Sequence, residues 1–218
     1  MQIAIPLFPG HTALDSVGPY QVFSYLPGAE VVVCAARPGV VEDDAGLLAV
    51  DVRRSLADVP SPDVIVVPGG QITHRMIRDG DPVIDWIRTT APHATWTTSV
   101  CTGALLLGAA GLLTGLPATT HWASYDVLAS FGASPTQQRV VEAGAVVTAA
   151  GVSAGIDLAL TLVGKLAGDD AARAIQLGIE YDPQPPYDAG APSKATPAIR
   201  ELVGAVLDEQ RRAALAGR

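Results

Sequence analysis

Short, almost continuously apolar runs alternate with longer Ala- and Leu-rich runs along this chain, and that alternation constrains its fold most strongly. The apolarity of the short runs is continuous from residue to residue, which is typical of strands buried on both faces, as in a parallel sheet. The sequence therefore predicts an α/β fold: a doubly wound, mostly parallel sheet flanked by helices. The expected strands are Gln2–Phe8, Glu30–Ala35, Asp63–Val67, Thr95–Val100 and Ala145–Ala149.

Helices are expected between these strands. In the run 154–167, the residues Ile156, Leu160 and Val163 follow the spacing of a buried helical stripe. The expected helices are Leu14–Tyr25, Val83–Thr90, Gly103–Leu113, Ser124–Phe131 and Ala154–Ala167.

The C-terminal part of the chain predicts a surface segment followed by one helix. The stretch from Asp182 to Pro197 is rich in proline and is expected to be extended. Thr196 is expected to cap an amphipathic helix that runs to about Ala216, with Pro197 at its first position. We expect residues 1–195 to form one α/β domain and residues 196–218 to pack as a helix on that domain or on a dimer partner.

The composition favours one large domain with its own core. The chain has 218 residues, of which 49% are hydrophobic and 17% charged, so it needs no disulfide or metal staple for stability. The formal net charge of -8 repels phosphate backbones and argues against nucleic-acid binding. The longest apolar run, 103–113, is far shorter than the ~20 residues that span a bilayer, and the N-terminus lacks a signal-peptide pattern. We expect a cytoplasmic protein that binds neither membranes nor nucleic acid.

The two cysteines have different surroundings. They form neither a disulfide framework nor a paired metal-ligand spacing, so no metal is expected. Cys34 lies inside the run EVVVCA and is expected to be a core residue. Cys101 lies where a strand runs into a small-residue helix, which is the arrangement of a nucleophile elbow. A helix N-terminus stabilises a thiolate by ~0.3–1 kcal/mol, so backbone N–H groups or another donor must supply more.

Two further turns are expected at the same edge of the sheet, where ligands bind in open parallel sheets. The sequence Pro68-Gly69-Gly70 has open backbone N–H groups that suit an anion or a dipole, or it is only a tight strand exit. Asp15, at the start of the first helix, is either a helix N-terminal carboxylate or a carboxyl group facing Cys101. No histidine is assigned as a catalytic base, and those considered were His11, His74, His93 and His121.

Several segments carry a resemblance to a known family. The first set is Leu14-Asp15 with Gly18-Pro19, Val66–Gly70 and Ser99–Gly103. A second set is Thr102–Leu113, Ala118–Trp122, Ala154–Asp157, Leu177, Glu180-Tyr181 and Pro185-Pro186. With the first set the chain resembles the ThiJ/PfpI superfamily, and with the second it resembles the isocyanide hydratases within it. The resemblance implies a flavodoxin-like, class I glutamine amidotransferase-like fold, no cofactor, and a homodimer.

The resemblance also implies an activity. Many relatives carry Glu on the first helix and His directly after the cysteine, where this chain has Asp15 and Thr102. That departure argues against a peptidase or an amidotransferase. The combination present implies a hydro-lyase that adds water to an isocyanide and releases an N-substituted formamide. Cys101 would form a thioimidate, Asp15 would act as general acid and base, and the Thr102 hydroxyl would stay near the pair.

Substrate-binding residues are expected around this pair. The N–H groups of Gly70 and Thr102 are expected to polarise the reacting group. The expected substrate-binding residues are Gly69, Gly70, Trp122, Gly151 and Val152. Other functions stay open: a glyoxalase- or deglycase-type enzyme, the ligand-sensing domain of an AraC-type regulator without its DNA-binding part, and a redox-sensing or chaperone-like protein.

Overall fold

The computed structural model describes residues 1–217 and is built around a seven-stranded sheet of order β10-β11-β7-β6-β1-β2-β5. All neighbouring strands pair in parallel except β10, which is antiparallel to β11. The expected doubly wound, mostly parallel sheet is therefore confirmed. Its strands are β1 (Gln2–Pro6), β2 (Glu30–Ala35), β5 (Arg54–Ser55), β6 (Val64–Val67), β7 (Trp96–Val100), β10 (Val140–Ala143) and β11 (Val146–Ala149).

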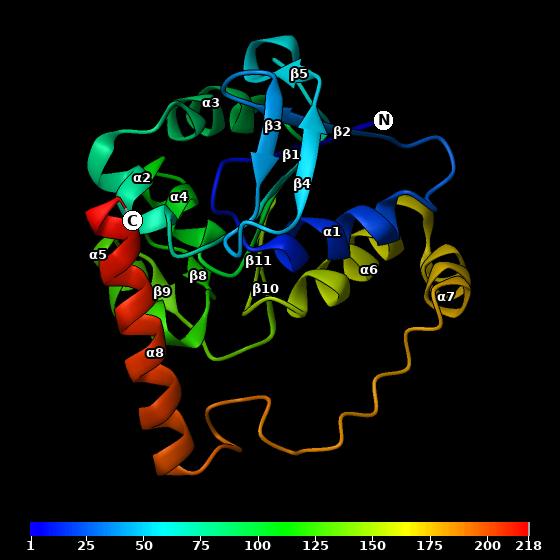
Figure 1. Cartoon of the computed structure of the whole chain (residues 1–218). Coiled ribbons are helices and arrows are strands. Elements are labelled where there is room, and N and C mark those ends of the chain that lie inside the picture. Colours follow the sequence, from blue (N-terminus) through cyan, green and yellow to red (C-terminus); the bar gives the residue numbers. More distant parts are fainter. Residues whose placement is uncertain (218) are drawn as a thin grey trace.

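Helices cover both faces of this sheet (Figure 1). The helices on one face are α2 (Thr73–Asp79), α3 (Pro82–Thr90), α4 (Gly103–Ala109) and α5 (Tyr125–Ser130). Those on the other face are α1 (Ala13–Phe23), α6 (Ala154–Ala167) and α7 (Asp169–Gly178). Short 3-10 turns lie at Leu56–Asp58, Ala91–His93 and Trp122–Ser124.

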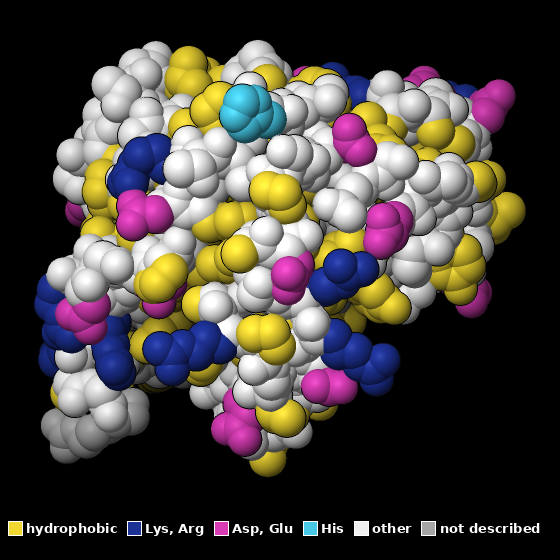
Figure 2. Space-filling model, turned by 90° about the horizontal axis from the view of Figure 1, so that it is seen from above, with side chains coloured by type: hydrophobic (Ala, Val, Ile, Leu, Met, Phe, Trp, Pro, Cys, Tyr) yellow, Lys and Arg dark blue, Asp and Glu magenta, His cyan; other side chains and the backbone are white. Residues whose placement is uncertain are grey.

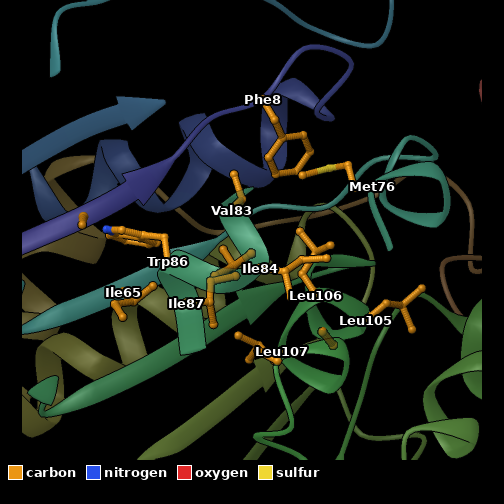
Figure 3. Packing of buried hydrophobic residues seen from close by; sticks show 14 of the residues in the cluster. Phe8, Ile65, Met76, Val83, Ile84, Trp86, Ile87, Leu105, Leu106 and Leu107 are labelled. Atoms are coloured by element: carbon orange, nitrogen blue, oxygen red, sulfur yellow. The ribbon is translucent and has the colours of Figure 1, made fainter. Parts of the chain in front are cut away.

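Each face of the sheet has its own hydrophobic cluster. Successive strand residues point to opposite faces, so Ile65 and Val67 of β6 pack on the α2–α5 side, and Val64 and Val66 pack on the α1, α6 and α7 side. Figure 3 shows part of the first cluster, with Trp86 and Ile87 of α3 near Ile65 and with Leu105, Leu106 and Leu107 on α4. Burial on both faces explains why the strand sequences are continuously apolar.

Elements with little buried apolar surface were missed by the sequence analysis. The hairpin β3 (Gly39–Glu42) and β4 (Ala49–Val52) is mostly exposed, and Ile175 is the one buried residue of α7. The unpredicted elements also include α2, β5, β8 (Pro117–Ala118), β9 (Ser134–Pro135) and β10. The helix expected over 103–113 ends at Ala109, because Gly111 takes a left-handed φ of 85°.

The C-terminal helix forms as the sequence predicts. Helix α8 (Pro197–Ala216) is capped by Thr196, whose Oγ1 accepts the Ile199 N–H at 3.4 Å. The segment between α7 and α8 crosses one end of the molecule as a long connection (Figure 1). The far end of α8 contacts α2, where Arg78 donates to the Leu215 carbonyl at 2.9 Å. Much of the rest of α8 is open, with Leu202 62% exposed.

Charges of both signs are mixed on the surface. Lys and Arg side chains on the face shown in Figure 2 lie beside Asp and Glu side chains. Exposed ion pairs such as Arg173–Asp170, at 2.8 Å, contribute to this mixture. Within residues 1–217, none of the helices combines the length and the apolar character needed to cross a bilayer.

Replacing a core leucine tests the two-faced packing. Leu158 of α6 is fully buried, whereas Leu177 of α7 is 80% exposed. We expect Leu158→Ala to lower the free energy of unfolding by about 2–5 kcal/mol, because it removes apolar contacts and leaves a cavity. Leu177→Ala should change it by less than about 0.5 kcal/mol. Urea unfolding measures both, and equal losses would contradict the packing described.

Candidate functional site

Cys101 lies in a strained turn between β7 and α4, with a φ of 56°. Such a φ is uncommon for a residue other than glycine and persists only when the surroundings hold it. The Cys101 N–H donates to the carbonyls of Ala149 and Ala150, at 3.1 and 2.9 Å. The Cys101 carbonyl accepts a hydrogen bond from Thr120 Oγ1 at 2.9 Å. The sharp strand-to-helix turn predicted at Cys101 is therefore present, and two other segments fix it.

The start of α4 approaches the end of β6 very closely. A Cβ at Gly103 would lie 2.2 Å from the Val67 carbonyl oxygen, so only glycine fits there. This contact brings Cys101 and Thr102 beside the turn formed by Pro68, Gly69 and Gly70.

The Gly69-Gly70 turn joins Asp15 to Thr102. Asp15 Oδ2 accepts the Gly69 N–H at 2.9 Å. Thr102 Oγ1 accepts the Gly70 N–H at 2.8 Å and donates to the Gly70 carbonyl at 2.9 Å. A Cβ at Gly69 would lie 2.6 Å from both N and Oγ1 of Thr102 and 2.9 Å from Asp15 Oδ2. A glycine is therefore required at position 69 for the carboxyl group and the cysteine turn to come together.

Asp15 and Cys101 form a buried, coupled pair. Asp15 is 0% exposed and Cys101 6%, and the thiol interacts with the carboxyl group. Within residues 1–217, Asp15 Oδ1 has no hydrogen-bond partner. Burial raises the pKa of Asp15 from 3.8 to about 7, against the opposing effects of the Gly69 N–H and the Cys101 thiol. Two such groups cannot both be ionised cheaply, so they hold one proton between them over a wide pH range.

Backbone N–H groups interact with the Cys101 thiol, as expected from the sequence, but they do not have the largest effect on its pKa. Burial and the Asp15 charge raise the pKa of the Cys101 thiol, whereas the N–H groups of Val152 and Thr102 lower it. The net shift is upward. The expected stabilisation of a free thiolate at the helix N-terminus is thus outweighed, and ionisation of the thiol depends on the proton held by Asp15.

Polarisation of the reacting group by the Gly70 N–H stays a prediction, and the structure adds a partner for this N–H. It donates to Thr102 Oγ1. Gly69 N–H is likewise bound to Asp15. The Thr102 N–H faces the Cys101 sulfur. The two glycines are therefore placed to position Asp15 and Thr102.

The remaining predicted site residues are Val152, Gly151 and Trp122. Val152 has a φ of 33°, and its backbone N–H lowers the pKa of the Cys101 thiol. Gly151 packs on His121, because a Cβ there would lie 2.8 Å from its Cδ2. Trp122 packs against His121 with ring centroids 5.6 Å apart, and it lines a pocket of about 130 Å³ with residues 189–192, Ala195 and α8. The part of Trp122 in substrate binding stays a prediction.

The histidines and the other cysteine have structural surroundings. His11 Nδ1 lies 3.1 Å from the Phe8 carbonyl, and His121 Nδ1 accepts the Ala123 N–H at 3.3 Å. Burial lowers the pKa of both rings. Cys34 is fully buried in the core, as predicted, and burial raises its pKa to about 12.

Sequence reasoning missed three contributors to the site. Thr120 holds the Cys101 carbonyl, and its place in the segment Ala118–Trp122, which carried part of the resemblance, was the available signal. Ala150 accepts the Cys101 N–H through its backbone, for which a sequence has no signal. Asp44 accepts a hydrogen bond from Thr12 Oγ1 at 2.7 Å, and its charge helps to raise the pKa of Asp15. Asp44 lies in the hairpin that was not predicted.

A cysteine in a strained strand-to-helix turn, facing a buried carboxyl group at the carboxyl edge of a parallel sheet, defines a class of flavodoxin-like α/β proteins. Comparison with known families gives the class its name. The sequence profile of the DJ-1/PfpI family matches residues 1–165. The chain belongs to this family, which confirms the resemblance seen in the sequence.

Individual relatives agree with this assignment. The chain is 44% identical over 214 residues to the isonitrile hydratase of Pseudomonas putida, covering 98% of this chain and 90% of that protein. A ThiJ/PfpI family protein from Pseudomonas syringae has a TM-score of 0.90 at 37% identity, covering 99% of this chain and 89% of that one. DJ-1beta of Drosophila melanogaster, with a TM-score of 0.74 at 21% identity over 82% of this chain and 97% of that one, shares the fold.

The raised pKa of Asp15 predicts a pH-dependent stability. The carboxyl group ionises near 3.8 in the unfolded chain and near 7 in the folded one. Between these values the folded protein binds more protons, so this group's contribution to stability is lost as the pH rises from about 4 to about 7. The loss is on the order of 3–4 kcal/mol. We expect Asp15→Asn, which cannot ionise, to remove this part of the pH dependence.

Urea unfolding at several pH values across this window measures the effect. Asp126→Asn, at an exposed position on α5, is the matched control and should keep the pH dependence of the wild type. Parallel curves for the wild type and Asp15→Asn would show that the Asp15 carboxyl ionises normally in the folded protein.

Proposed function

We propose that this protein is an isocyanide hydratase, a hydro-lyase that adds water to an isocyanide and releases an N-substituted formamide. The observation that carries the proposal is the buried Cys101–Asp15 pair, which combines a soft nucleophile with one transferable proton. The 44% identity to an isonitrile hydratase over 98% of this chain supports it. Of the activities considered from the sequence, this one uses an Asp–Cys–Thr site without a histidine beside the cysteine.

The first step joins the substrate to the enzyme. The terminal carbon of R–N≡C is attacked by the Cys101 sulfur as the thiol proton passes to Asp15. Asp15 then delivers that proton to the same carbon. One S–C bond and one C–H bond form, the S–H bond breaks, and the product is the thioimidate R–N=CH–S–Cys101. A carboxyl group with a pKa of about 7 suits this step, because it both accepts and gives up a proton near neutral pH.

The second step hydrates the thioimidate. Asp15, now ionised, removes a proton from water as the water oxygen attacks the thioimidate carbon. Asp15 then passes that proton to the thioimidate nitrogen. The adduct R–NH–CH(OH)–S–Cys101 then breaks its C–S bond and releases R–NH–CHO. The hydroxyl proton returns to the Asp15–Cys101 pair, so the net reaction adds one water and restores the enzyme.

The residues around the pair have positioning and electrostatic roles. The N–H groups of Thr102 and Val152 stabilise negative charge on the sulfur as the C–S bond breaks. The Thr102 hydroxyl, bound to both N and O of Gly70, holds the turn that orients Asp15 through Gly69. A buried site with few charges suits a small neutral substrate, and an isocyano group is linear and uncharged.

We also propose that the enzyme works without a cofactor, in the cytoplasm, and as a homodimer. Three apolar side chains of α1, the helix that carries Asp15, are exposed: Leu14, Val17 and Tyr20. Val17 and Tyr20 border an apolar groove of about 270 Å³ between α1 and the neighbouring strands. A second copy of the chain would cover this surface. Helix α8 would then pack on its own domain or on the partner.

Turnover of an aromatic isocyanide tests the activity. We expect wild-type protein to form the formamide, detected by absorbance and mass spectrometry. Cys101→Ala should abolish turnover, because no covalent intermediate can form. Asp15→Asn should lower kcat by at least ~10²-fold, because proton transfer by a positioned side chain contributes about that much or more.

Cys34→Ala is the matched control, because Cys34 is buried in the core away from the site, and it should retain activity. Absence of turnover by the wild type, or full turnover by Cys101→Ala, would overturn the proposal. Conversion of methylglyoxal to lactate in place of isocyanide turnover would favour the glyoxalase alternative.

A further inference from the structure

The turn between β11 and α6, residues 150–153, touches Cys101 at two points. The Ala150 carbonyl accepts the Cys101 N–H at 2.9 Å, and the backbone N–H of Val152 lowers the pKa of the Cys101 thiol. Val152 has a left-handed φ of 33°, which is strained for a β-branched residue. A strained turn needs surrounding contacts that hold its shape. Side chains from neighbouring segments supply these contacts.

Arg139 holds this turn from both sides. Its carbonyl, just before β10, accepts the Ala150 N–H at 2.9 Å. Its guanidinium donates to Ser153 Oγ at 3.2 Å and to the Asp157 carboxylate in the first turn of α6. One residue therefore fixes the beginning of the turn through its backbone and the end through its side chain.

Tyr181 connects a third segment to this cluster. Its hydroxyl donates to Asp157 Oδ1 at 3.1 Å, so the chain after α7 is tied to the start of α6. Asp157 and Tyr181 both lie in segments that the proposed chemistry leaves without a role. The neighbouring Arg173 forms its ion pairs within residues 1–217 with Asp169 and Asp170 of its own helix, so it provides an internal comparison.

We infer that Arg139, together with Asp157 and Tyr181, positions the 150–153 turn so that the Val152 N–H stays on the Cys101 sulfur. Arg139 acts through this turn and does not itself touch the sulfur. The inference deepens the proposed function, since it rests on Cys101 being the reactive nucleophile. It concerns the reactivity of the thiol and is measurable without an isocyanide.

Alkylation of Cys101 by iodoacetamide tests this role. The experiment uses the full chain with Cys34→Ala in every protein, and the modified peptide is identified by mass spectrometry. We expect Arg139→Met to slow alkylation about tenfold at a fixed pH near 8, because losing one N–H donor to a charged sulfur raises the thiol pKa by about one unit. The ultraviolet absorbance of the thiolate should appear at correspondingly higher pH.

The two readouts separate positioning from access. A change in access alone would slow alkylation and leave the thiolate absorbance where it was, and that result would overturn the inference. Arg139→Lys should recover part of the rate, because an ammonium group pairs with Asp157 but lacks the fixed fork that also reaches Ser153. Arg173→Met should react like the wild type.

Tyr181→Phe keeps the test decisive if Arg139→Met fails to fold. It should slow alkylation by a smaller factor than Arg139→Met and shift the thiolate absorbance in the same direction, whereas Tyr187→Phe, at an exposed tyrosine, should do neither. Wild-type rates in both a folded Arg139 variant and Tyr181→Phe would refute the positioning role. Neither outcome depends on hydratase turnover, so this inference and the proposed function fail separately.

Discussion

The contact between the start of α4 and the end of β6 is the constraint on which the site depends. Gly103 lies so close to the Val67 carbonyl that any side chain would be excluded. This closeness places Cys101 in a strained turn and sets Thr102 against Gly70, while Gly69 reaches across to Asp15. Gly69 and Gly103 are needed because they have no side chain. Their absence of a Cβ lets the backbone after β6 approach the start of α4, and this approach brings Asp15 and Cys101 together.

Burial then gives the pair its chemistry. A solvated carboxyl group would ionise near 3.8 and be a poor proton donor at neutral pH, but burial moves the pKa of Asp15 to about 7. The same burial, with the Asp15 charge, holds the thiol in its protonated form until the proton can move to its neighbour. The two side chains thus combine a thiol that becomes a nucleophile on losing its proton with a carboxyl group whose pKa lies near neutral pH. A single isolated cysteine or aspartate would not provide this combination.

The parts of this arrangement that were predicted from sequence follow from local patterns. The apolar runs around Val64–Val67 and Trp96–Val100 predicted a parallel sheet, and the small residues after Cys101 predicted the sharp turn. Ligands bind at the carboxyl ends of parallel strands, and from this rule Asp15 and Gly69 were correctly predicted to lie at that edge of the sheet. The hydrogen bond from the Gly70 N–H to Thr102 Oγ1 could not be predicted, because it joins residues 32 positions apart that only the fold brings together. Arg139, Asp157 and Tyr181 are far apart in the chain, and only the fold brings them together.

The central claim is that burial brings the pKa of Asp15 to about 7, so that its carboxyl group both accepts and gives up a proton near neutral pH. Carbon-detected NMR of protein labelled at its aspartate carboxyl groups follows this titration directly, with Asp15→Asn identifying the resonance. The account predicts that the Asp15 signal titrates near pH 7 in the wild type and moves when Cys101 is replaced by alanine. A signal that titrates near 3.8 and ignores the substitution would contradict it.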